Sequence, residues 1–327
     1  MKSPSSWIAF LLPLALAAVV DAAGAAAPAV RIGYPQLSAG SMPLWVMTDA
    51  RLDQRYGVDV KSIYIAGGAT LTRSLIAGDV DVALTGGAVV GAILSGAELV
   101  YAGIGLSTYA FSVYARPEIK TVGDLRGKVF GVITKGASSD HAAIALFNRY
   151  GMKAGQDVQF LYYARQGDLL ASLDKGIVSA GVLSSPTTVA ARRLGYKELV
   201  NIASFKLPYP HNAIATRRAL VRQNPELIKG FLKSYVAAIK IVHEEPATAK
   251  RALARYLTKD PEMLDDAYGA APLFLKVPYM PEEAIRTVLA LSDHPKAASA
   301  DPKDFFDNRP LKELEDSGFV KELYSGR

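Results

Sequence analysis

The chain has 327 residues, of which 50% are hydrophobic, with 27 Gly, 18 Pro, 4 His and no Cys. This apolar content excludes a disordered chain, and the length is enough for two ordinary domains. The absence of cysteine excludes a disulfide scaffold, a thiolate nucleophile, a Cys-ligated metal or iron–sulfur site and a lipidated cysteine anchor. The net charge of +6 is spread along the chain, so composition gives no support for a nucleic-acid partner.

The first residues have the pattern of a secretory signal. Lys2 is followed by an apolar run over residues 7–20, which ends at Asp21 and is followed by small residues. A short positive end, an apolar stretch of about 7–15 residues and a small-residue exit are typical of such signals. A membrane span, the alternative, needs about 20 apolar residues, and Asp21 ends the run too early. We therefore predict a signal peptide over residues 1–25, cleaved near Ala25.

Strand and helix patterns alternate after this segment. A helix is expected to begin at Pro43 and to end at Gly57, and the next helix opens at Gly67. The strands between them are expected at 30–34, 58–65 and 80–84. This order predicts a parallel sheet with helices on its faces. In such sheets, ligands collect at the carboxyl ends of the strands.

A weak internal similarity suggests a second lobe of the same design. Residues 75–84 and 173–182 both read as a helix end, a glycine and a buried strand. Any α/β protein contains several connections of the helix–glycine–strand kind, so the similarity alone does not establish a second lobe. The second lobe is expected to begin just before a capping box at Thr121 and Asp124, followed by a strand over 129–133.

From residue 224 onward the chain becomes helical. A long helix is expected to start at Pro225, and later helices are separated at Pro246, Pro261 and Pro281. We expect this helical tail to pack back on one of the lobes.

Five loops that follow the predicted strands are small, polar and rich in glycine. Glycine lets a ligand approach the backbone closely, and the first amides of a following helix have no partner inside that helix. Such amides attract carboxylate, sulfonate or phosphate groups, by about 0.3–1 kcal/mol for each helix end. Ordinary turn chemistry explains any one loop, but five in succession favour a ligand cleft. The loops are 35–41, 67–70, 85–87, 135–139 and 184–186.

No catalytic or metal motif is present in the sequence. The four histidines share no metal-ligand spacing, and Pro246 breaks the helix that a zinc-protease reading of His243 would need. Gly-x-Ser-x-Gly, Walker and Ser-x-x-Lys patterns are missing. We therefore expect no catalytic residue, no metal and no cofactor. His211 is the one histidine that we place near a ligand, with a plain loop histidine as the alternative.

The order of these features resembles a known family. The signal segment, the glycine pair at Gly67, the stretch 75–83 and the stretch 125–132 before Lys135 form a series. It resembles the solute-binding proteins of ABC importers for nitrate, sulfonates, taurine and thiamine-pyrimidine precursors. The resemblance covers essentially the whole mature chain.

That resemblance implies an α/β fold of the type II periplasmic binding proteins. Two lobes, each a sheet flanked by helices, are joined by two crossing segments that act as a hinge, with the ligand enclosed between the lobes. Lobe 1 would comprise residues 30–115 and 216–327, and lobe 2 residues 116–215. The crossings are expected near 111–116 and 211–216.

The family's binding positions, carried over to the matching loops, imply a set of ligand contacts. No arginine stands at a matching loop position to clamp a sulfonate or nitrate. Arg165 lies near the second-lobe cleft and is either a contact or a solvated charge. The implied contacts are Gln36, Ser38, Gly67, Gly68, Thr85, Gly86, Ser107, Gly136, Ser138, Ser139, Ser184, Tyr209 and His211.

Aromatic residues near loop ends suggest a pocket for an aromatic or other organic anion, although core packing is the simpler explanation for most of them. They are Tyr34, Trp45, Tyr109, Tyr162, Tyr163 and Tyr209.

The favoured hypothesis is a periplasmic, monomeric receptor without a lipid anchor, which captures a small anionic organic solute and delivers it to an ABC permease in the inner membrane. One alternative is a ligand-sensing module for a membrane receptor such as a kinase. Another is an enzyme similar to the synthases of the thiamine pyrimidine. Those enzymes have a cysteine-rich motif and a cytosolic location, and this chain predicts neither.

Overall fold

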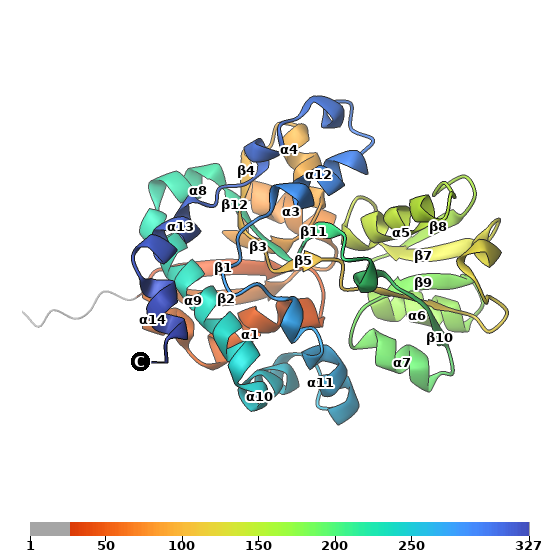
Figure 1. Ribbon diagram of the computed structural model, residues 1–327, viewed down its shortest axis with the longest axis horizontal. Helices are drawn as coiled ribbons and strands as arrows, with labels where there is room; N and C mark the ends of the chain where they lie inside the picture. Colours follow the sequence, from red (N-terminus) through yellow and green to blue (C-terminus); the bar gives the residue numbers. More distant parts are fainter. Residues whose placement is uncertain (1–26, 327) are drawn as a thin grey trace, which may run out of the picture.

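The computed structural model describes residues 27–326 and places two α/β lobes side by side along the long axis of the molecule (Figure 1). The predicted signal peptide, residues 1–25, lies outside the described residues. Over residues 27–326, no helix combines the length and the apolar character that crossing a membrane would require.

The sheet of lobe 1 has the strand order β2-β1-β3-β12-β4. Strand β1 (Ala29–Tyr34) pairs in parallel with β2 (Asp59–Tyr64) and β3 (Val82–Thr85). Strand β12 (Ala213–Arg217) runs antiparallel to β3 and to β4 (Leu99–Gly103). The direction of β12 follows from the connection, because the chain re-enters this sheet from the other lobe, at the edge where β3 ends.

Helices cover both faces of this sheet. Helix α9 (Pro225–Glu244) buries Phe231, Leu232 and Tyr235 at helical spacing and packs against α1 (Met42–Asp49). On the same face lie α2 (Leu52–Arg55), α10 (Pro246–Tyr256) and α13 (Arg309–Asp316). The opposite face carries α3 (Gly68–Ala77), α4 (Ala88–Leu94) and α12 (Glu282–Ala290). The remaining helices of this lobe are α8 (Arg218–Gln223), α11 (Pro261–Tyr268) and α14 (Phe319–Tyr324). The helical tail therefore packs on lobe 1.

The prediction of a single helix between Pro43 and Gly57 is wrong. It is divided into α1 and α2, because Arg51 adopts a left-handed conformation with φ of 53°. The apolar spacing continues across this break, so the hydrophobic pattern gave no sign of it.

The sheet of lobe 2 has the order β10-β6-β9-β7-β8. Strand β7 (Val129–Ile133) pairs in parallel with β8 (Gln159–Tyr163) and β9 (Ala180–Leu183). Strands β6 (Ser112–Ala115) and β10 (Lys197–Asn201) complete the other side, with β6 antiparallel to both of its neighbours. Helix α5 (Ser138–Arg149) covers one face, and α6 (Gln166–Asp174) and α7 (Thr187–Arg193) cover the other.

The two lobes share one design. Strands β3 and β9 are the central strands of their sheets, and each follows a helix that ends at a glycine with positive φ. These glycines are Gly78, at 84°, and Gly176, at 72°. The similarity between residues 75–84 and 173–182 therefore reflects equivalent positions in the two lobes.

Two strands connect the lobes. Strand β5 (Leu106–Thr108) pairs antiparallel with β11 (Pro208–His211) in a separate two-stranded sheet, which lies between the lobes in Figure 1. The predicted boundaries at residues 115 and 216 therefore need correction. Strand β6 already belongs to the second sheet and β12 already belongs to the first, so each crossing ends a few residues earlier than expected. The sequence of an apolar strand does not indicate which sheet it joins. Only its pairing with neighbouring strands assigns β6 to lobe 2 and β12 to lobe 1.

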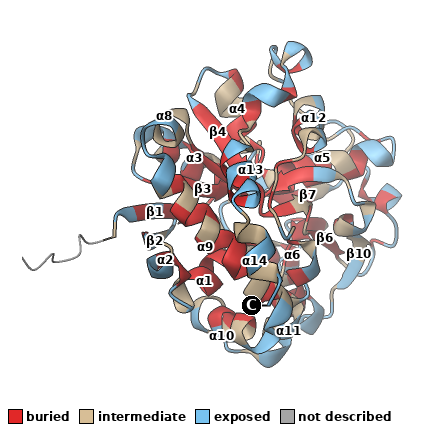
Figure 2. Ribbon diagram, turned by 60° about the vertical axis from the view of Figure 1, so that its left-hand side comes forward, coloured by how far each residue is buried: buried red, intermediate tan, exposed pale blue. Residues whose placement is uncertain are grey.

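Burial follows this arrangement. The central strands of both sheets are buried, whereas the edge strands β2, β8 and β10 and the outer faces of the helices are largely exposed or half-buried (Figure 2). A single apolar cluster runs from lobe 1 through Tyr109, Phe111 and Tyr209 of the hinge into lobe 2. The rings of Tyr109 and Tyr209 stack with centroids 4.1 Å apart. The hinge is therefore a packed apolar connection.

Candidate functional site

A small cavity lies between the lobes, where the carboxyl ends of β1, β3 and β7 meet. Its volume is about 20 Å³, which is room for about one water molecule. The structure thus shows the lobes closed on each other at the strand ends. The predicted site residues that line this cavity are Gln36, Gly68, Thr85, Gly86, Ser138, Ser139 and His211.

Two helix N-termini converge on the cavity, one from each lobe. Gly68 is the first residue of α3, and Ser138 and Ser139 begin α5. The first amides of each helix lack intrahelical partners and carry the positive end of the helix dipole. The ideal Cβ position of Gly68 lies 3.4 Å from the Cβ of Ala137, so the two helix starts approach closely at a position that suits glycine.

Side chains from the hinge add to this polar lining. The backbone N–H of Ala110 donates to Nδ1 of His211 at 3.2 Å, so in the neutral imidazole the proton is on Nε2. Burial lowers the pKa of His211 to about 4, which keeps the ring neutral near pH 7. Asn212 follows in a left-handed conformation with φ of 49°, and its buried Nδ2 has no hydrogen-bond partner within residues 27–326.

Of the described residues that line the cavity, none carries a charged side chain. The lining instead combines helix N-termini, hydroxyls, the side-chain amides of Gln36 and Asn212 and a neutral imidazole. Such a set stabilises an anion through hydrogen bonds and the helix dipoles, without a cationic side chain.

One lining hydroxyl already donates to and accepts from the backbone. Ser139 Oγ donates to the carbonyl oxygen of Ile133 at 2.6 Å and accepts from its N–H at 2.9 Å. This side chain therefore fixes the corner between β7 and α5. Ser138 lies next to it with its Oγ facing lobe 1, 2.2 Å from the ideal Cβ position of Gly86.

Several implied contacts lie outside the cavity. Ser38 is buried just before a 3-10 turn, and Ser107 lies half-buried in the hinge strand β5. Gly67 N donates to the carbonyl oxygen of Pro35 at 3.3 Å. Ser184 is hydrogen-bonded twice to the side chain of Gln166, at 2.8 and 3.0 Å. These residues shape the strand ends rather than line the cavity.

Tyr209 links both lobes through its hydroxyl. Its oxygen accepts from the N–H of Gly87 in lobe 1 at 3.0 Å, and it lies 3.0 Å from Nδ1 of His141 in lobe 2. Burial lowers the pKa of His141 to about 4. Because Tyr209 accepts from Gly87, its own proton is available for Nδ1 of His141, which leaves the histidine proton on Nε2.

A larger pocket of about 400 Å³ opens beside this bridge, also between the lobes. Gly136 lines it, and the Gly136 N–H donates to Asp140 at 2.7 Å. Tyr162 OH donates to the other carboxylate oxygen of Asp140 at 3.1 Å. The remaining walls are mostly apolar, with charges at the mouth. They include His141, Ile144, Phe160, Val288, Leu291, Lys135 and Asp293.

We call this pocket of about 400 Å³ the rim pocket. Within it, burial raises the pKa of Asp140, although the hydrogen bonds of Asp140 act to lower it.

Arg165 lines neither of the two interlobe spaces. Its guanidinium pairs with Asp168 at 3.0 and 3.1 Å, and both side chains are exposed. The aromatic set is also mostly structural. Tyr34 and Trp45 pack edge to face in the core of lobe 1, and only Tyr162 of that set lines the rim pocket among the described residues.

Sequence reasoning missed two residues of the site. His141 lies three positions after Ser138, which places both on one face of α5, and that spacing was available in the sequence. Asn212 follows His211 directly, and asparagine is enriched at positive φ. Within residues 27–326, no group of three or more His, Asp or Glu residues is arranged to hold a metal ion.

Comparison with known proteins identifies the fold and the family of the chain. A curated protein of Brachyspira hyodysenteriae, described as an ABC transporter periplasmic binding protein, is 22% identical over 236 residues, 67% of each chain. The solved alkanesulfonate-binding protein SsuA of Xanthomonas axonopodis, bound to MOPS, has a TM-score of 0.73 at 20% identity. That match covers 85% of this chain and 98% of SsuA.

The solved periplasmic nitrate-binding protein NrtA of Synechocystis has a TM-score of 0.71 at 14% identity, covering 88% of each chain. All three names are those of binding proteins and not of enzymes. The two-lobed fold is therefore that of the periplasmic binding proteins. The family model described as NMT1/THI5 like matches residues 54–249, more than half of the chain. The chain belongs to the NMT1/THI5-like family.

Proposed function

We propose that this protein is the periplasmic solute-binding component of an ABC importer. It captures a small anionic organic solute, such as a sulfonate, a carboxylate or an aromatic acid, between its two lobes. Hinge closure brings both lobes onto the ligand, and the closed form then meets the permease in the inner membrane. The names of the similar proteins support the transport role.

The observation that carries the proposal is the convergence of α3 and α5 on one uncharged interlobe cavity. Each N-terminus contributes about 0.3–1 kcal/mol to an anion, and up to about 2 kcal/mol when partly buried. Hydrogen bonds to a charged group contribute about 1.5–3 kcal/mol each. Micromolar affinity requires about 8 kcal/mol, so a few such contacts with some apolar burial are enough.

The two spaces between the lobes suggest that different parts of one ligand occupy them. The strand-end cavity of about 20 Å³ is matched to one polar group, whereas the rim pocket of about 400 Å³ has the volume for an organic body. Gly86 and Gly87 are adjacent in the chain and line one space each. We therefore favour an anionic head at the helix N-termini and an apolar body toward Ile144 and Leu291.

A ligand panel tests the function directly. Alkanesulfonates, carboxylates and aromatic acids should be titrated calorimetrically, and unfolding should be followed with each at high concentration. A ligand at 100 times its dissociation constant stabilises the fold by about 2.7 kcal/mol. If no organic anion binds or raises the melting temperature, the proposed ligand class is wrong.

The site residues are tested by removing single hydroxyls. Thr85→Val and Ser138→Ala should each lower the affinity of the best ligand about ten- to a hundredfold, because each removes one hydrogen bond of about 1.5–3 kcal/mol to a charged group. Ser95→Ala is the matched control, since Ser95 bonds the carbonyl oxygen of Gly91 at the far end of α4. Equal affinities for all three variants would place the ligand elsewhere.

A further inference from the structure

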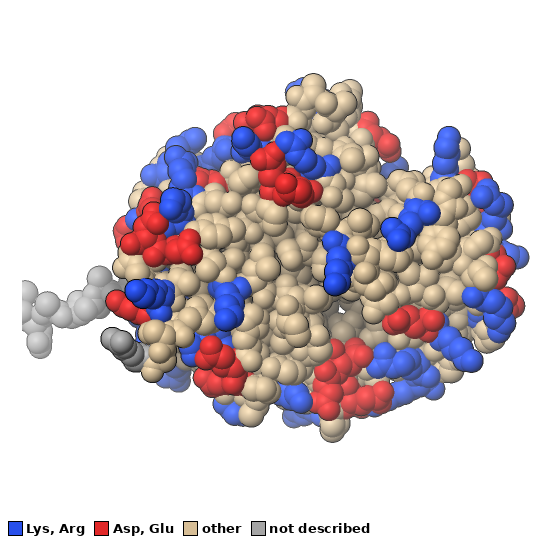
Figure 3. Space-filling view, viewed as in Figure 1, with Lys and Arg blue, Asp and Glu red and all other residues tan. Residues whose placement is uncertain are grey.

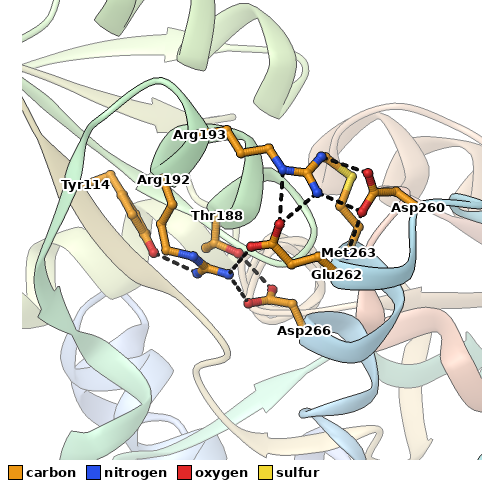
Figure 4. A network of polar contacts seen from close by, with 8 residues as sticks. All are labelled: Tyr114, Thr188, Arg192, Arg193, Asp260, Glu262, Met263 and Asp266. Atoms are coloured by element: carbon orange, nitrogen blue, oxygen red, sulfur yellow. Dashed lines mark hydrogen bonds and ion pairs between the residues drawn. The ribbon is translucent and has the colours of Figure 1, made fainter.

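A cluster of ion pairs joins the lobes on the side of α7 and α11 (Figure 4). Arg193, in α7 of lobe 2, binds both carboxylate oxygens of Asp260 at 2.7 and 2.9 Å. It also binds one oxygen of Glu262 through two nitrogens, at 2.7 and 3.0 Å. Arg192 binds Asp266 of α11 at 2.7 Å. We call these five residues the interlobe ion cluster.

The ion cluster is anchored on both sides. Arg192 also donates to the hydroxyl of Tyr114, in β6 of lobe 2, at 3.1 Å. Thr188, one helical turn before Arg192, donates to Asp266 at 2.9 Å. Burial acts to raise the pKa of Asp266, but its hydrogen bonds, including those from Arg192 and Thr188, outweigh burial and lower it. The geometry is multidentate, unlike that of an isolated surface ion pair.

The ion pairs of the cluster lie between the lobes, although Arg192 also bonds Tyr114 within lobe 2 and Asp260 caps α11 within lobe 1. Every ion pair in it joins α7 of lobe 2 to the segment 260–266 of lobe 1. Each lobe has its own sheet, and the connection between the sheets is the hinge formed by β5 and β11. Rotation about this hinge therefore breaks the ion pairs and leaves both sheets intact. Acidic and basic side chains meet along the lower edge of the space-filling view, next to a hollow between the lobes (Figure 3).

The other interlobe contacts differ in kind. Around the cavity, the lobes meet through Gly86, Gly87, Ser138, His141 and Tyr209, all of them neutral near pH 7. Salt screens exposed charges, with a Debye length of about 10 Å at 0.1 M and 3 Å at 1 M, and it acts little on neutral contacts. Among residues 27–326, the ion pairs between the lobes lie in the ion cluster, so this part of the interface is the one that salt should weaken most.

We propose that the interlobe ion cluster is an electrostatic latch that biases the protein toward the closed form through contacts of its own side chains. For a ligand that binds the closed form, the apparent affinity scales with the closed fraction. Salt then lowers affinity even for a ligand that touches none of these residues. The effect on affinity rests on the proposed function, whereas the bias toward closure does not.

The first experiment measures closure without a ligand. The chain has no cysteine, so Lys153→Cys in lobe 2 and Gln223→Cys in lobe 1, both exposed, give one defined pair of spin labels. Raising salt from 0.05 to 1 M should shift the distance distribution toward an open form. Arg192→Met with Arg193→Met should give the same shift at low salt and should abolish the salt effect.

A charge swap separates the latch from damage to the fold. Arg193→Glu alone should open the protein, and Arg193→Glu combined with Glu262→Arg, which keeps the N-cap of α11 at Asp260, should restore the closed distance. Arg309→Met is the matched control, because Arg309 pairs with Asp307 within lobe 1 and should leave the distances unchanged. Distances that do not respond to salt or to the double methionine variant overturn the proposal, as does a swap that fails to restore closure.

The second experiment measures the best ligand of the panel. The double methionine variant should release it about tenfold faster at low salt. A label distance that responds while no organic anion binds would support the latch and contradict the proposed function. If an organic anion binds but the double methionine variant releases it at the wild-type rate, the proposed function is supported and the latch is contradicted.

Discussion

Lowering the pH from 8 to 4 should reduce the free energy of unfolding by about 3 kcal/mol for each of two histidines. His141 and His211 are 6% and 3% exposed, and burial lowers the pKa of each to about 4. An unfolded histidine titrates near 6.5. Between these values the unfolded chain binds more protons than the native one, so stability falls as the pH falls through this window. Above pH 6.5 the effect vanishes, because both states are neutral.

The measurement is urea denaturation at a series of pH values between 4 and 8. His141→Gln and His211→Gln should each remove about half of the slope. Asp140 acts in the opposite direction, since the native state raises its pKa and therefore gains a proton before the unfolded chain does. A stability that is flat from pH 7 to pH 4.5 would show that both histidines are hydrated or charged in the native state.

Gly87→Ala should lower the affinity for ligand by up to about 100-fold without destabilising either lobe. A Cβ at Gly87 would lie 2.5 Å from Nδ1 of His141 and 2.6 Å from the hydroxyl of Tyr209. Overpacking of this kind costs about 1–3 kcal/mol. Because His141 lies in the other lobe, this cost destabilises the closed form relative to the open form. The backbone itself permits alanine, because Gly87 has φ of −54° and ψ of −20°.

Gly167→Ala, near the start of the lobe-2 helix α6, provides the control. Its Cβ would meet no atom within 4 Å and it lines neither interlobe space, so the affinity should be unchanged and the helix slightly more stable. Calorimetry gives the affinities, and thermal unfolding checks that both variants fold. Equal affinities for the two alanine variants would mean that the lobes do not need this contact to close on a ligand.

Local patterns in the sequence determined much of the fold. The strand pattern at 129–133 matches β7 residue for residue, and the capping box of Thr121 and Asp124 is present. The glycine-rich loops lie at strand ends as expected, because a parallel sheet places its connections at defined edges. These features depend on neighbours within a few residues, which a sequence displays directly.

Tertiary structure decided what depends on partners far along the chain. Whether 112–115 joins the first or the second sheet is settled by its pairing with β9 and β10. Ser139 lines the strand-end cavity, and only the fold shows that its hydroxyl also hydrogen-bonds the N–H and the carbonyl oxygen of Ile133. The hydroxyl of Tyr209 hydrogen-bonds both Gly87 and His141. These three residues lie in segments that are far apart in the sequence and share no motif.

The same division applies to the two arginines of α7. As a sequence, Arg192 and Arg193 are two charges at the end of a helix, where cations are commonly found. Only the closing of the lobes brings Asp260, Glu262 and Asp266 to them from a segment nearly 70 positions away. Local composition determines helices, strands and loop chemistry, because those rest on short-range backbone and side-chain preferences. The contacts between the lobes come from the geometry of the hinge, which no local pattern encodes.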